Sequence, residues 1–483
     1  MGITLGLDIG TTSLSAVAFD YERCSVVAQV TQQNDGVRYA DLPGGLQFAE
    51  LDLAALERQL PQLLRALLAQ LPDPRQVSAI GVTGQQHGMA LLDLQGRPLG
   101  AAITWQDQRT LLPSPSGETP LQAFLRLAGG SAAFEPMGCL PAAGYMGPTL
   151  HWLHTQGQVD LAGARVAMIP DVAVSLLTGQ LPATDTTNGG SSALLDLSSG
   201  DWAWQVIDRL GLPRSVFPPI KPAGTPQGSL LPALATASGL AQVPVCVAAG
   251  DNQASFAGSM SAPLDDLLVN VGTGGQISAL VRQRVRVPGV ETRAFFGDAF
   301  LLVGAGLYGG RAYAYLRDLF LETARAFWFE PSDDDLFEHM NALAAAVAPG
   351  CDGLRFEPLF TGTRDNPDLR ASITGIGATN LTPGHLARAL LEGIAEGFYQ
   401  QFRAMQSVLG PRQGLVGAGN GITHNPVLAE AVVQRFDLPL SLTGTVEAAA
   451  LGAALLAADG TGALPLAEGM ASLRYDRRLL PQR

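Results

Sequence analysis

Apolar and polar positions alternate at the start of the chain. Between residues 4 and 9 the apolar side chains share one face of the pattern, while Gly6 and Asp8 lie on the other. This period of two is typical of a β-strand, which we expect to end at Asp8. The turn residues Gly10–Ser13 follow, and residues 14–19 return to an apolar run. The pattern predicts a β-hairpin whose tip could present backbone N–H groups to an anion.

A helical period comes next. Leucines recur at three- and four-residue spacing from Leu53 to Leu71, although Pro61 is expected to bend or divide the helix. A short strand is predicted at Val77–Val82, leading into the turn Gly84–Gly88. Strand and helix signals then alternate to the end of the chain, which indicates an α/β fold.

An internal repeat organises the chain. Leu268–Gly275 repeats the opening theme, an apolar strand running into Gly-Thr and other small residues. A Pro-rich stretch at Pro213–Pro232 and a predicted strand at Val243–Ala248 mark the boundary between the two copies, near residue 249. We therefore predict two domains built on one plan, residues 1–248 and 249–483, with their two hairpin tips facing each other.

Composition narrows the function. With 483 residues, 47% hydrophobic and 15% charged, the chain is large enough for two compact domains. Its net charge of −13 opposes binding to nucleic acid or an anionic membrane, so we expect neither as a partner. The four cysteines show no CxxC spacing, and we interpret them as buried free thiols. Because no signal peptide or membrane-spanning run is evident, we expect a cytoplasmic protein.

Lysine is almost missing from the chain. Lys221 is the single lysine, and it lies in a proline-flanked loop without a GxxxxGK context. P-loop kinases, protein kinases and pyridoxal-phosphate enzymes each need a positioned lysine. All three classes are therefore disfavoured.

Two aspartates stand at predicted strand ends. Asp8 precedes the first tip, and Asp251 follows Ala249-Gly250. An isolated aspartate beside glycine most often caps a turn. Phosphoryl transfer, however, needs one carboxylate to orient Mg²⁺ and often another to accept the proton of the attacking hydroxyl. Because both aspartates lie near small hydroxyl and glycine tips, we favour this division of tasks.

The tips themselves are candidate phosphate sites. Thr11, Thr12 and Gly272–Gly274 could hold phosphate oxygens through hydroxyl and N–H groups without a lysine. Each tip alone is a weak signal, and their duplication carries the interpretation. Gly304–Gly309 matches GxGxxG, which could mark a dinucleotide fold or simple packing glycines. We favour a glycine-rich helix entry near a phosphate.

Other glycines and rings complete the site. Gly417–Gly421 precedes Asn425-Pro426, an N-cap followed by a first-turn proline, and a helix is predicted to Phe436. These glycines could form a nucleoside pocket, with a tight structural turn as the alternative. His87 with Gln86, and the stretch from Trp105 to Asp107, supply polar groups and a ring suited to a sugar.

Five motifs occur in the order seen in the FGGY family of carbohydrate kinases, which the chain resembles over almost its whole length. They are Asp8–Thr12, Gly84–Gly88, Gly250–Gln253, Gly272–Gly274 and Gly417–Asn420. Ala371–Ile376, continued by His385-Leu386 and Leu391-Glu392, also resembles the family's C-terminal signature.

The resemblance implies two ribonuclease-H-like domains of the actin and sugar-kinase type, with an active-site cleft between them. Residues 1–248 would bind the sugar and residues 249–483 ATP, with Mg²⁺ as the second cofactor. Asp251 would be the catalytic base, and Asp8 would position Mg²⁺. The implied substrate contacts are Gln86, His87, Trp105, Asp107, Asp251 and Asn252; the implied nucleotide and phosphate contacts are Thr11, Thr12, Gly272, Thr273, Gly274, Gly309, Gly419 and Asn420.

The chain departs from the family at two positions. Ser15 stands where a basic residue is frequent, and Thr149 stands where a second family signature usually has lysine. Neither position is the implied base. Phosphate neutralisation would therefore rely more on Mg²⁺ and on backbone N–H groups.

Within the family, Gln86-His87-Gly88 resembles the ketose kinases rather than the glycerol kinases, which carry an Arg-Glu pair there. Thr104–Asp107 resembles sedoheptulokinase, whereas Thr184-Asp185 is equally close to xylulokinase. The preferred interpretation is a kinase that makes sedoheptulose 7-phosphate, with D-xylulose 5-phosphate as the alternative product.

Two rival classes stay open. The chain could be a sugar- or nucleotide-binding regulator without turnover, or an actin-like or chaperone-like ATPase that needs no sugar. The expected partner is a small ketose, and a homodimer is one assembly that we consider.

Overall fold

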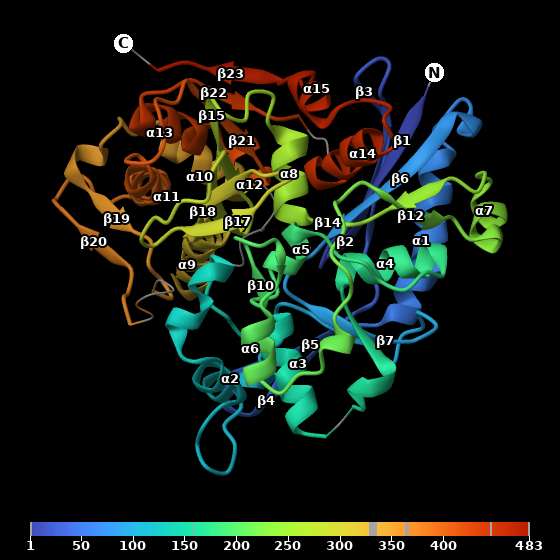
Figure 1. Ribbon diagram of the computed structural model, residues 1–483. Helices are drawn as coiled ribbons and strands as arrows, with labels where there is room; N and C mark the ends of the chain where they lie inside the picture. The colour runs from blue at the N-terminus through green and yellow to red at the C-terminus, as the bar shows by residue number, and fades with distance from the viewer. Residues whose placement is uncertain are drawn as a thin grey trace.

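The computed structural model describes residues 2–157, 159–327, 336–362, 366, 368–444 and 447–481. Within them, two seven-stranded sheets form the two halves of the molecule, and a smaller lobe with a five-stranded sheet extends from the first half (Figure 1). No helix in these residues is long and apolar enough to span a bilayer.

The elements have the following bounds. The first sheet contains β1 (Ile3–Ile9), β2 (Ser13–Asp20), β3 (Ser25–Gln33), β6 (Val77–Gly84), β12 (Pro226–Ser229), β13 (Pro244–Cys246) and β14 (Ala249–Gly250). The second contains β15 (Asp266–Val271), β16 (Gly274–Val281), β17 (Glu291–Ala294), β18 (Phe300–Tyr308), β21 (Gly414–Ala418), β22 (Leu440–Leu442) and β23 (Arg477–Leu479). The lobe contains β4 (Val37–Leu42), β5 (Leu46–Leu51), β7 (Met89–Asp93), β8 (Ala102–Ile103) and β9 (Ala164–Met168), and two-stranded pairs are formed by β10 (Leu195–Asp196) with β11 (Asp201–Trp202) and by β19 (Arg355–Glu357) with β20 (Ser372–Thr374).

The helices of the first half are α1 (Leu53–Leu68), α2 (Pro120–Ala128), α3 (Met146–Thr155), α4 (Ile169–Thr178), α5 (Thr186–Gly190), α6 (Trp204–Arg209) and α7 (Pro232–Ser238). Those that follow are α8 (Asp251–Ser259), α9 (Gly310–Phe327), α10 (Leu336–Ala345), α11 (Pro383–Met405), α12 (Asn420–Thr423), α13 (Pro426–Phe436), α14 (Ala448–Gly460) and α15 (Leu466–Ala471).

The first sheet confirms the predicted opening hairpin. β1 pairs antiparallel with β2 and parallel with β6, and the path runs β12-β13-β6-β1-β2-β3. β1 ends at Ile9, one residue beyond the expected end, and β6 reaches Gly84 because both strands continue their pairing to that point. The predicted strand after the Pro-rich stretch is shorter, since only Pro244–Cys246 pairs there.

The second sheet has the same plan as the first. β15 pairs antiparallel with β16 and parallel with β21, and β18 and β22 extend the two sides. A central hairpin with a parallel strand on one side and an antiparallel strand on the other therefore occurs in both sheets. This arrangement confirms the internal repeat and the expected two-domain α/β fold.

Two central helices join the halves. α14 is buried along most of its length and packs on β1, β2 and β6 of the first sheet as well as on α8. The backbones approach closely: a Cβ on Gly6 would lie 1.8 Å from the Ala450 carbonyl oxygen, and one on Gly452 would lie 1.9 Å from that of Ala254. Glycine is the one residue that permits this spacing. One apolar cluster accordingly includes side chains from both sheets, α8 and α14.

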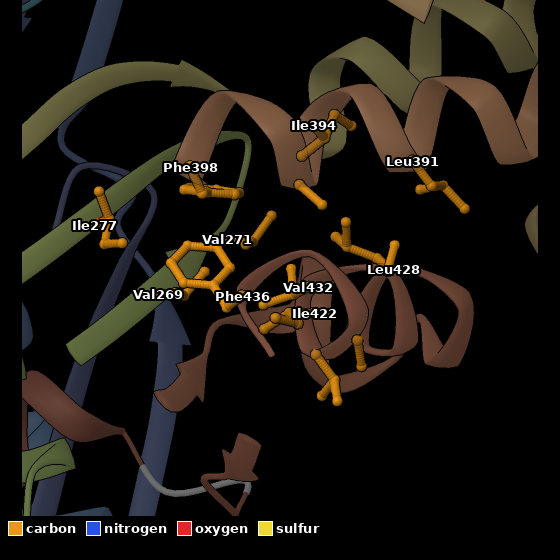
Figure 2. Close-up of a cluster of buried hydrophobic side chains, with 14 of the residues drawn as sticks. Val269, Val271, Ile277, Leu391, Ile394, Phe398, Ile422, Leu428, Val432 and Phe436 are labelled. Atoms are coloured by element: carbon orange, nitrogen blue, oxygen red, sulfur yellow. The ribbon is translucent and has the colours of Figure 1, made fainter. Parts of the chain in front are cut away.

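The core of the second half lies between its sheet and the helices α11 and α13. Figure 2 shows Val269, Val271 and Ile277 of the hairpin pointing toward Phe398 of α11 and Val432 of α13. All five side chains are buried. This packing fixes the end of β15, from which the second tip extends.

The structure contradicts the division of the first long helix at Pro61 and the helix entry expected at Gly304. Pro61 does not divide α1, because the buried leucine face continues on both sides of it and Asp52 caps the helix start. Gly304–Tyr308 is not a helix entry but the end of β18, paired with β16; only Gly309 immediately precedes a helix, α9. The predicted helix after Asn425 is confirmed: Asn425 Oδ1 accepts from the Leu428 N–H at 3.0 Å, and α13 ends at Phe436.

Candidate active site

The two candidate aspartates lie at one edge of the first sheet. Asp8 is the penultimate residue of β1, and Asp251 is the first residue of α8, directly after β14. β1 and β14 both run parallel to β6, and Ile9 and Gly250 pair with the same residue, Gly84. Because the ends of parallel strands meet at one edge, residues distant in sequence come together here.

The electrostatics of this edge are unusual. Burial, followed by the nearby carboxylates of Asp251 and Glu447, raises the pKa of Asp8 to about 8. Burial also raises the pKa of Asp251 to about 6, although the Asn252 N–H and the charge of Arg293 favour its ionised form. At pH 7 the structure therefore favours a neutral Asp8 and an ionised Asp251.

Glu447 is a site residue that sequence reasoning missed. It stands at the N-cap of α14, and its carboxylate accepts a hydrogen bond from the Thr31 hydroxyl at 2.9 Å. Its sequence context is a single acidic residue before an alanine-rich helix, which carries no chemical signal. The packing of α14 against β1 brings it near Asp8.

The edge of the first sheet where Asp251 and Glu447 lie near Asp8, here called the acidic edge, fits a divalent cation. Asp8 Oδ1 is buried and accepts no hydrogen bond from the described residues. A cation would satisfy this oxygen and relieve the repulsion among the three carboxylates. The described residues contain no preformed cluster of three metal-ligating side chains. That absence is compatible with Mg²⁺, which commonly keeps several waters and takes one or two carboxylates.

The Gln86-His87 turn follows β6 and is held by the segment after α4. The Gln86 side-chain amide donates to the Thr187 carbonyl at 2.9 Å, and the His87 N–H donates to the Ser191 hydroxyl at 3.1 Å. His87 adopts a left-handed φ of 72° and stacks on Tyr145, with ring centroids 4.0 Å apart. A strained backbone held by this many contacts is typical of a functional position.

A small cavity at this turn, with room for about one water molecule, is lined by both halves of the molecule. Its wall includes Gln86, His87, Thr187, Gln253 and Arg293. Arg293 comes from β17 of the second sheet and forms an ion pair of 2.6 Å with Glu291 on the same strand. Sequence reasoning missed both residues of this pair, because their strand reaches the cavity only through long-range packing. The Gln253 amide donates to the Ala294 carbonyl at 3.0 Å and so joins α8 to β17.

Asn252 links the turn at Asp251 to the second hairpin. Its side-chain amide donates to Gln276 Oε1 at 2.8 Å, and Gln276 lies on β16 shortly after the second tip. Its own side-chain oxygen is buried and has no hydrogen-bond partner among the described residues. Asp251 and Asn252 therefore lie where the two hairpins approach each other.

Trp105 and Asp107 differ in their surroundings. The Trp105 indole N–H donates to the Thr11 hydroxyl at 3.0 Å, and 45% of the residue is exposed. Asp107 is buried in the lobe, where its carboxylate accepts from the Ala49 N–H at 2.9 Å and pairs with Arg109 at 3.0 Å. Trp105 thus lies at the first tip, while the partners of Asp107 belong to the lobe.

The tips and the C-terminal glycine loop lie at strand ends. Thr12 is exposed, as are Gly272, Thr273 and Gly274, and the Gly310 N–H at the start of α9 donates to the Gly272 carbonyl at 2.9 Å. Gly419 has φ 84°, and a Cβ there would lie 2.6 Å from the Val271 carbonyl oxygen. This close approach sets the loop against the end of β15, beside the second tip. Asn420 is exposed at the start of α12.

Comparison with known proteins decides the family. Residues 3–258 match the N-terminal domain of the FGGY family of carbohydrate kinases, and residues 267–459 match its C-terminal domain. The chain belongs to the FGGY family of carbohydrate kinases. It is therefore an ATP-dependent phosphotransferase with an alcohol group as acceptor.

Individual FGGY relatives differ in the substrate that their names state. Human sedoheptulokinase is 28% identical, covering 94% of this chain and 97% of its own length. Glycerol kinase of Thermus brockianus is also 28% identical, covering 100% and 94%. The crystal structure of xylulose kinase from Rhodospirillum rubrum superimposes with a TM-score of 0.84 at 26% identity, covering 99% and 94%.

The two positions that depart from the FGGY pattern, Ser15 and Thr149, lie in different parts of the structure. The Ser15 hydroxyl lies 3.1 Å from that of Thr31, which in turn donates to Glu447. Thr149 is buried in α3, within the lobe. Ser15 is therefore joined to the acidic edge by hydrogen bonds rather than by a positive charge.

Proposed function

We propose that this FGGY kinase phosphorylates a ketose, with sedoheptulose as the preferred substrate and sedoheptulose 7-phosphate as the product. The observation that carries the proposal is the Gln86-His87 turn, which lines a cavity together with Gln253, two residues from Asp251. A ketose presents a carbonyl and several hydroxyls, and the amide and imidazole suit these groups. The likeness to human sedoheptulokinase adds support.

In the proposed mechanism Asp251 is the general base. Because its pKa is about 6, its carboxylate is ionised at neutral pH and can accept the proton of the sugar hydroxyl. The hydroxyl oxygen forms its bond to the γ-phosphorus of ATP as the bond to the leaving ADP oxygen breaks. Asp251 lies at the start of α8, whose position is fixed by both sheets.

The remaining residues divide binding between them. Asp8, with Glu447 beside it, would hold Mg²⁺, which neutralises charge on the β- and γ-phosphates when bound. Thr11, Thr12 and Gly272–Gly274 would hold phosphate oxygens through hydroxyl and N–H groups. Gly309 would lie near the phosphates at the start of α9. Gly419 and Asn420 would flank the adenosine, and Trp105, Asp107 and Asn252 would complete the sugar site.

The backbone carbonyl of Ser191 would orient His87 for substrate binding. Its Nδ1 lies 2.8 Å from the Ser191 carbonyl oxygen. A carbonyl accepts only, so Nδ1 carries a proton and donates it to this bond. The bond fixes the orientation of the imidazole in the wall of the cavity.

The test is ADP release with Mg-ATP against sedoheptulose, D-xylulose, L-ribulose, D-ribulose, L-fuculose, L-rhamnulose and glycerol. We expect the highest kcat/KM with sedoheptulose. Asp251→Ala should lower kcat by about 10²- to 10⁴-fold, the usual contribution of a general base, while circular dichroism shows the fold retained. Full activity of a folded Asp251→Ala variant would contradict the mechanism.

D-Xylulose is the second candidate, supported by the structural likeness to the xylulose kinase of Rhodospirillum rubrum. A higher kcat/KM with D-xylulose would replace the preferred substrate without changing the mechanism. Glycerol as the best substrate would contradict the ketose proposal. Binding without turnover across the panel would support a regulator, and rapid ATP hydrolysis without sugar would support an ATPase.

A further inference from the structure

The short helix α5 and Ser191 after it contact two parts of the active site at once. Thr187, on the first turn of α5, is buried. Its hydroxyl oxygen accepts a hydrogen bond from the Gly250 N–H at 2.8 Å, and its carbonyl accepts from the Gln86 side-chain amide at 2.9 Å. Gly250 is the N-cap of α8, directly before Asp251. One residue therefore joins the proposed base to the proposed sugar-binding turn.

The Thr187 hydroxyl both donates and accepts a hydrogen bond. It lies 2.8 Å from each carboxylate oxygen of Asp185. A hydroxyl has one proton, and a backbone N–H can only donate. Thr187 therefore accepts from Gly250 and donates to Asp185, and these two bonds fix its side-chain rotamer.

Asp185 is itself held firmly. It is buried and accepts from the N–H groups of Thr187 at 3.1 Å and Asn188 at 2.9 Å. Burial raises its pKa to about 6, while these N–H groups and the Thr187 hydroxyl favour the ionised form. At neutral pH Asp185 is thus an acceptor, as the direction of the hydroxyl bond requires. The chain of bonds runs from Asp185 through Thr187 to Gly250.

The same segment fixes the other residue of the sugar-binding turn. The Ser191 hydroxyl accepts from the His87 N–H and donates to the Asn188 carbonyl at 2.7 Å. Gln86, His87 and the turn before Asp251 are therefore all bonded to one five-residue helix and the residue that follows it. A shift of that helix would move the sugar contacts and the base together.

We infer that Thr187 is a positioning residue. Its hydroxyl sets the direction of the Asp251 carboxylate, and its carbonyl holds the Gln86 side chain in place. The sugar and the base thereby keep a fixed position relative to each other. The inference rests on the proposed role of Asp251 as base. Loss of the hydroxyl would leave the buried Gly250 N–H without an acceptor and allow the first turn of α8 to shift. Since a misplacement of about 1 Å can cost about 10²-fold in rate, the effect should fall on kcat.

The test compares Thr187→Val, which keeps the shape but loses the hydroxyl, with Thr187→Ser, which keeps the hydroxyl. With the best ketose, we expect Thr187→Val to lower kcat by about 10- to 100-fold, with the KM for ATP within about 2-fold of the unmodified chain. Thr187→Ser should restore kcat to within about 3-fold, because its hydroxyl can make both bonds.

Ser192→Ala is the matched control. Ser192 is equally buried, and its hydroxyl bonds to the Gly189 carbonyl within the same segment, not to the Asp251 turn. We expect its kcat to stay near that of the unmodified chain. If kcat is unchanged in Thr187→Val, or falls equally in Thr187→Ser or Ser192→Ala, the positioning role is wrong.

A second measurement needs no turnover. Amide hydrogen exchange at Gly250 should be faster in Thr187→Val than in Thr187→Ser or the unmodified chain, because the N–H has lost its acceptor. Equal exchange in all three would overturn the inference even if no sugar in the panel is phosphorylated. If Thr187→Val does not fold, Thr187→Cys takes its place, since a thiol is a weak hydrogen-bond group, and the same order is expected.

Discussion

The two hairpin tips occupy the same place in two copies of one fold, yet the polar residue before each tip is not the same. Leu7-Asp8-Ile9-Gly10-Thr11 at the first tip corresponds to Val269-Asn270-Val271-Gly272-Thr273 at the second. Each central polar residue lies on a strand paired antiparallel with the hairpin partner and parallel with the next strand. The first copy carries a carboxylate where the second carries an amide.

The surroundings explain the difference. Asp8 lies near the carboxylates of Asp251 and Glu447, so its ionised form is favoured only when a cation is bound. Asn270 lies against the backbone of Gly419, where a Cβ would come within 2.7 Å of the Asn270 side-chain oxygen. A neutral side chain would avoid repelling the phosphates of ATP at a tip where no metal ligand is proposed. The duplicated fold thus supplies two similar tips, and we propose that the exchange of Asp8 for Asn270 separates their tasks.

Among changes to the two tips, the larger effect is expected from making the first tip like the second. Asp8→Asn keeps the size of the side chain but removes the charge that would hold Mg²⁺. We expect kcat to fall by about 10²- to 10³-fold in steady-state ADP release. Circular dichroism should show an unchanged fold, since Asp8 Oδ1 has no hydrogen-bond partner to lose among the described residues. Retained activity would remove Asp8 from the proposed metal site.

The reciprocal change should have a smaller effect. Asn270→Asp places a carboxylate at the second tip, where it would repel the phosphates of ATP. We expect the KM for ATP to rise by about 10-fold while the KM for the sugar stays within about 2-fold. Initial rates over a matrix of ATP and sugar concentrations separate the two constants. An effect on the sugar KM alone would show that the two tips are not divided as proposed.

The smallest expected effect concerns pH. The proposed base Asp251 would act when ionised, so kcat/KM should rise with pH through its pKa of about 6 and level off above it. The charge of Arg293 favours the ionised form of Asp251, so Arg293→Met should raise this pKa. The acidic limb, meaning the rising part of the pH profile of kcat/KM, should then move to higher pH by less than about one pH unit. Arg293→Lys keeps the charge and should leave the limb in place.

Arg284, which also lies in the second half of the molecule, offers a matched control. Arg284 donates to the Glu135 carbonyl and to Ser198 at 3.2 Å, and so joins the second half to the lobe outside the cavity. Arg284→Met should not move the acidic limb. If both methionine variants move it equally, the cause is the packing of the lobe and not the charge of Arg293.

The features that could be predicted from the sequence are local ones. The alternation around Asp8 and the Asn425-Pro426 helix start depend on neighbours a few residues apart, and both predictions are confirmed. The repeat of the first tip at the second was also visible, because each copy carries its own pattern. The wrong expectation for Pro61 has the same origin, since packing of the leucine face outweighs the local preference of proline.

The missed residues depend on tertiary packing. Glu447 reaches Asp8 because α14 crosses to the first sheet, and Arg293 reaches the cavity because β17 packs against the lobe. Thr187 gave no signal either, since its role lies in bonds to residues distant in sequence. Period and motif spacing contain no information about such contacts.

The position of α14 has a consequence for how this chain can be divided. The family's N-terminal match ends at residue 258, but the helix that covers β1 and β6 comes from residues 448–460. A fragment ending before α8 would expose the sheet surface around Gly6 and Gly81, which is shaped for close contact with the α14 backbone. We expect such a fragment to aggregate when made alone and to fold when co-expressed with its complement. The two copies are alike in plan, but they are not interchangeable modules.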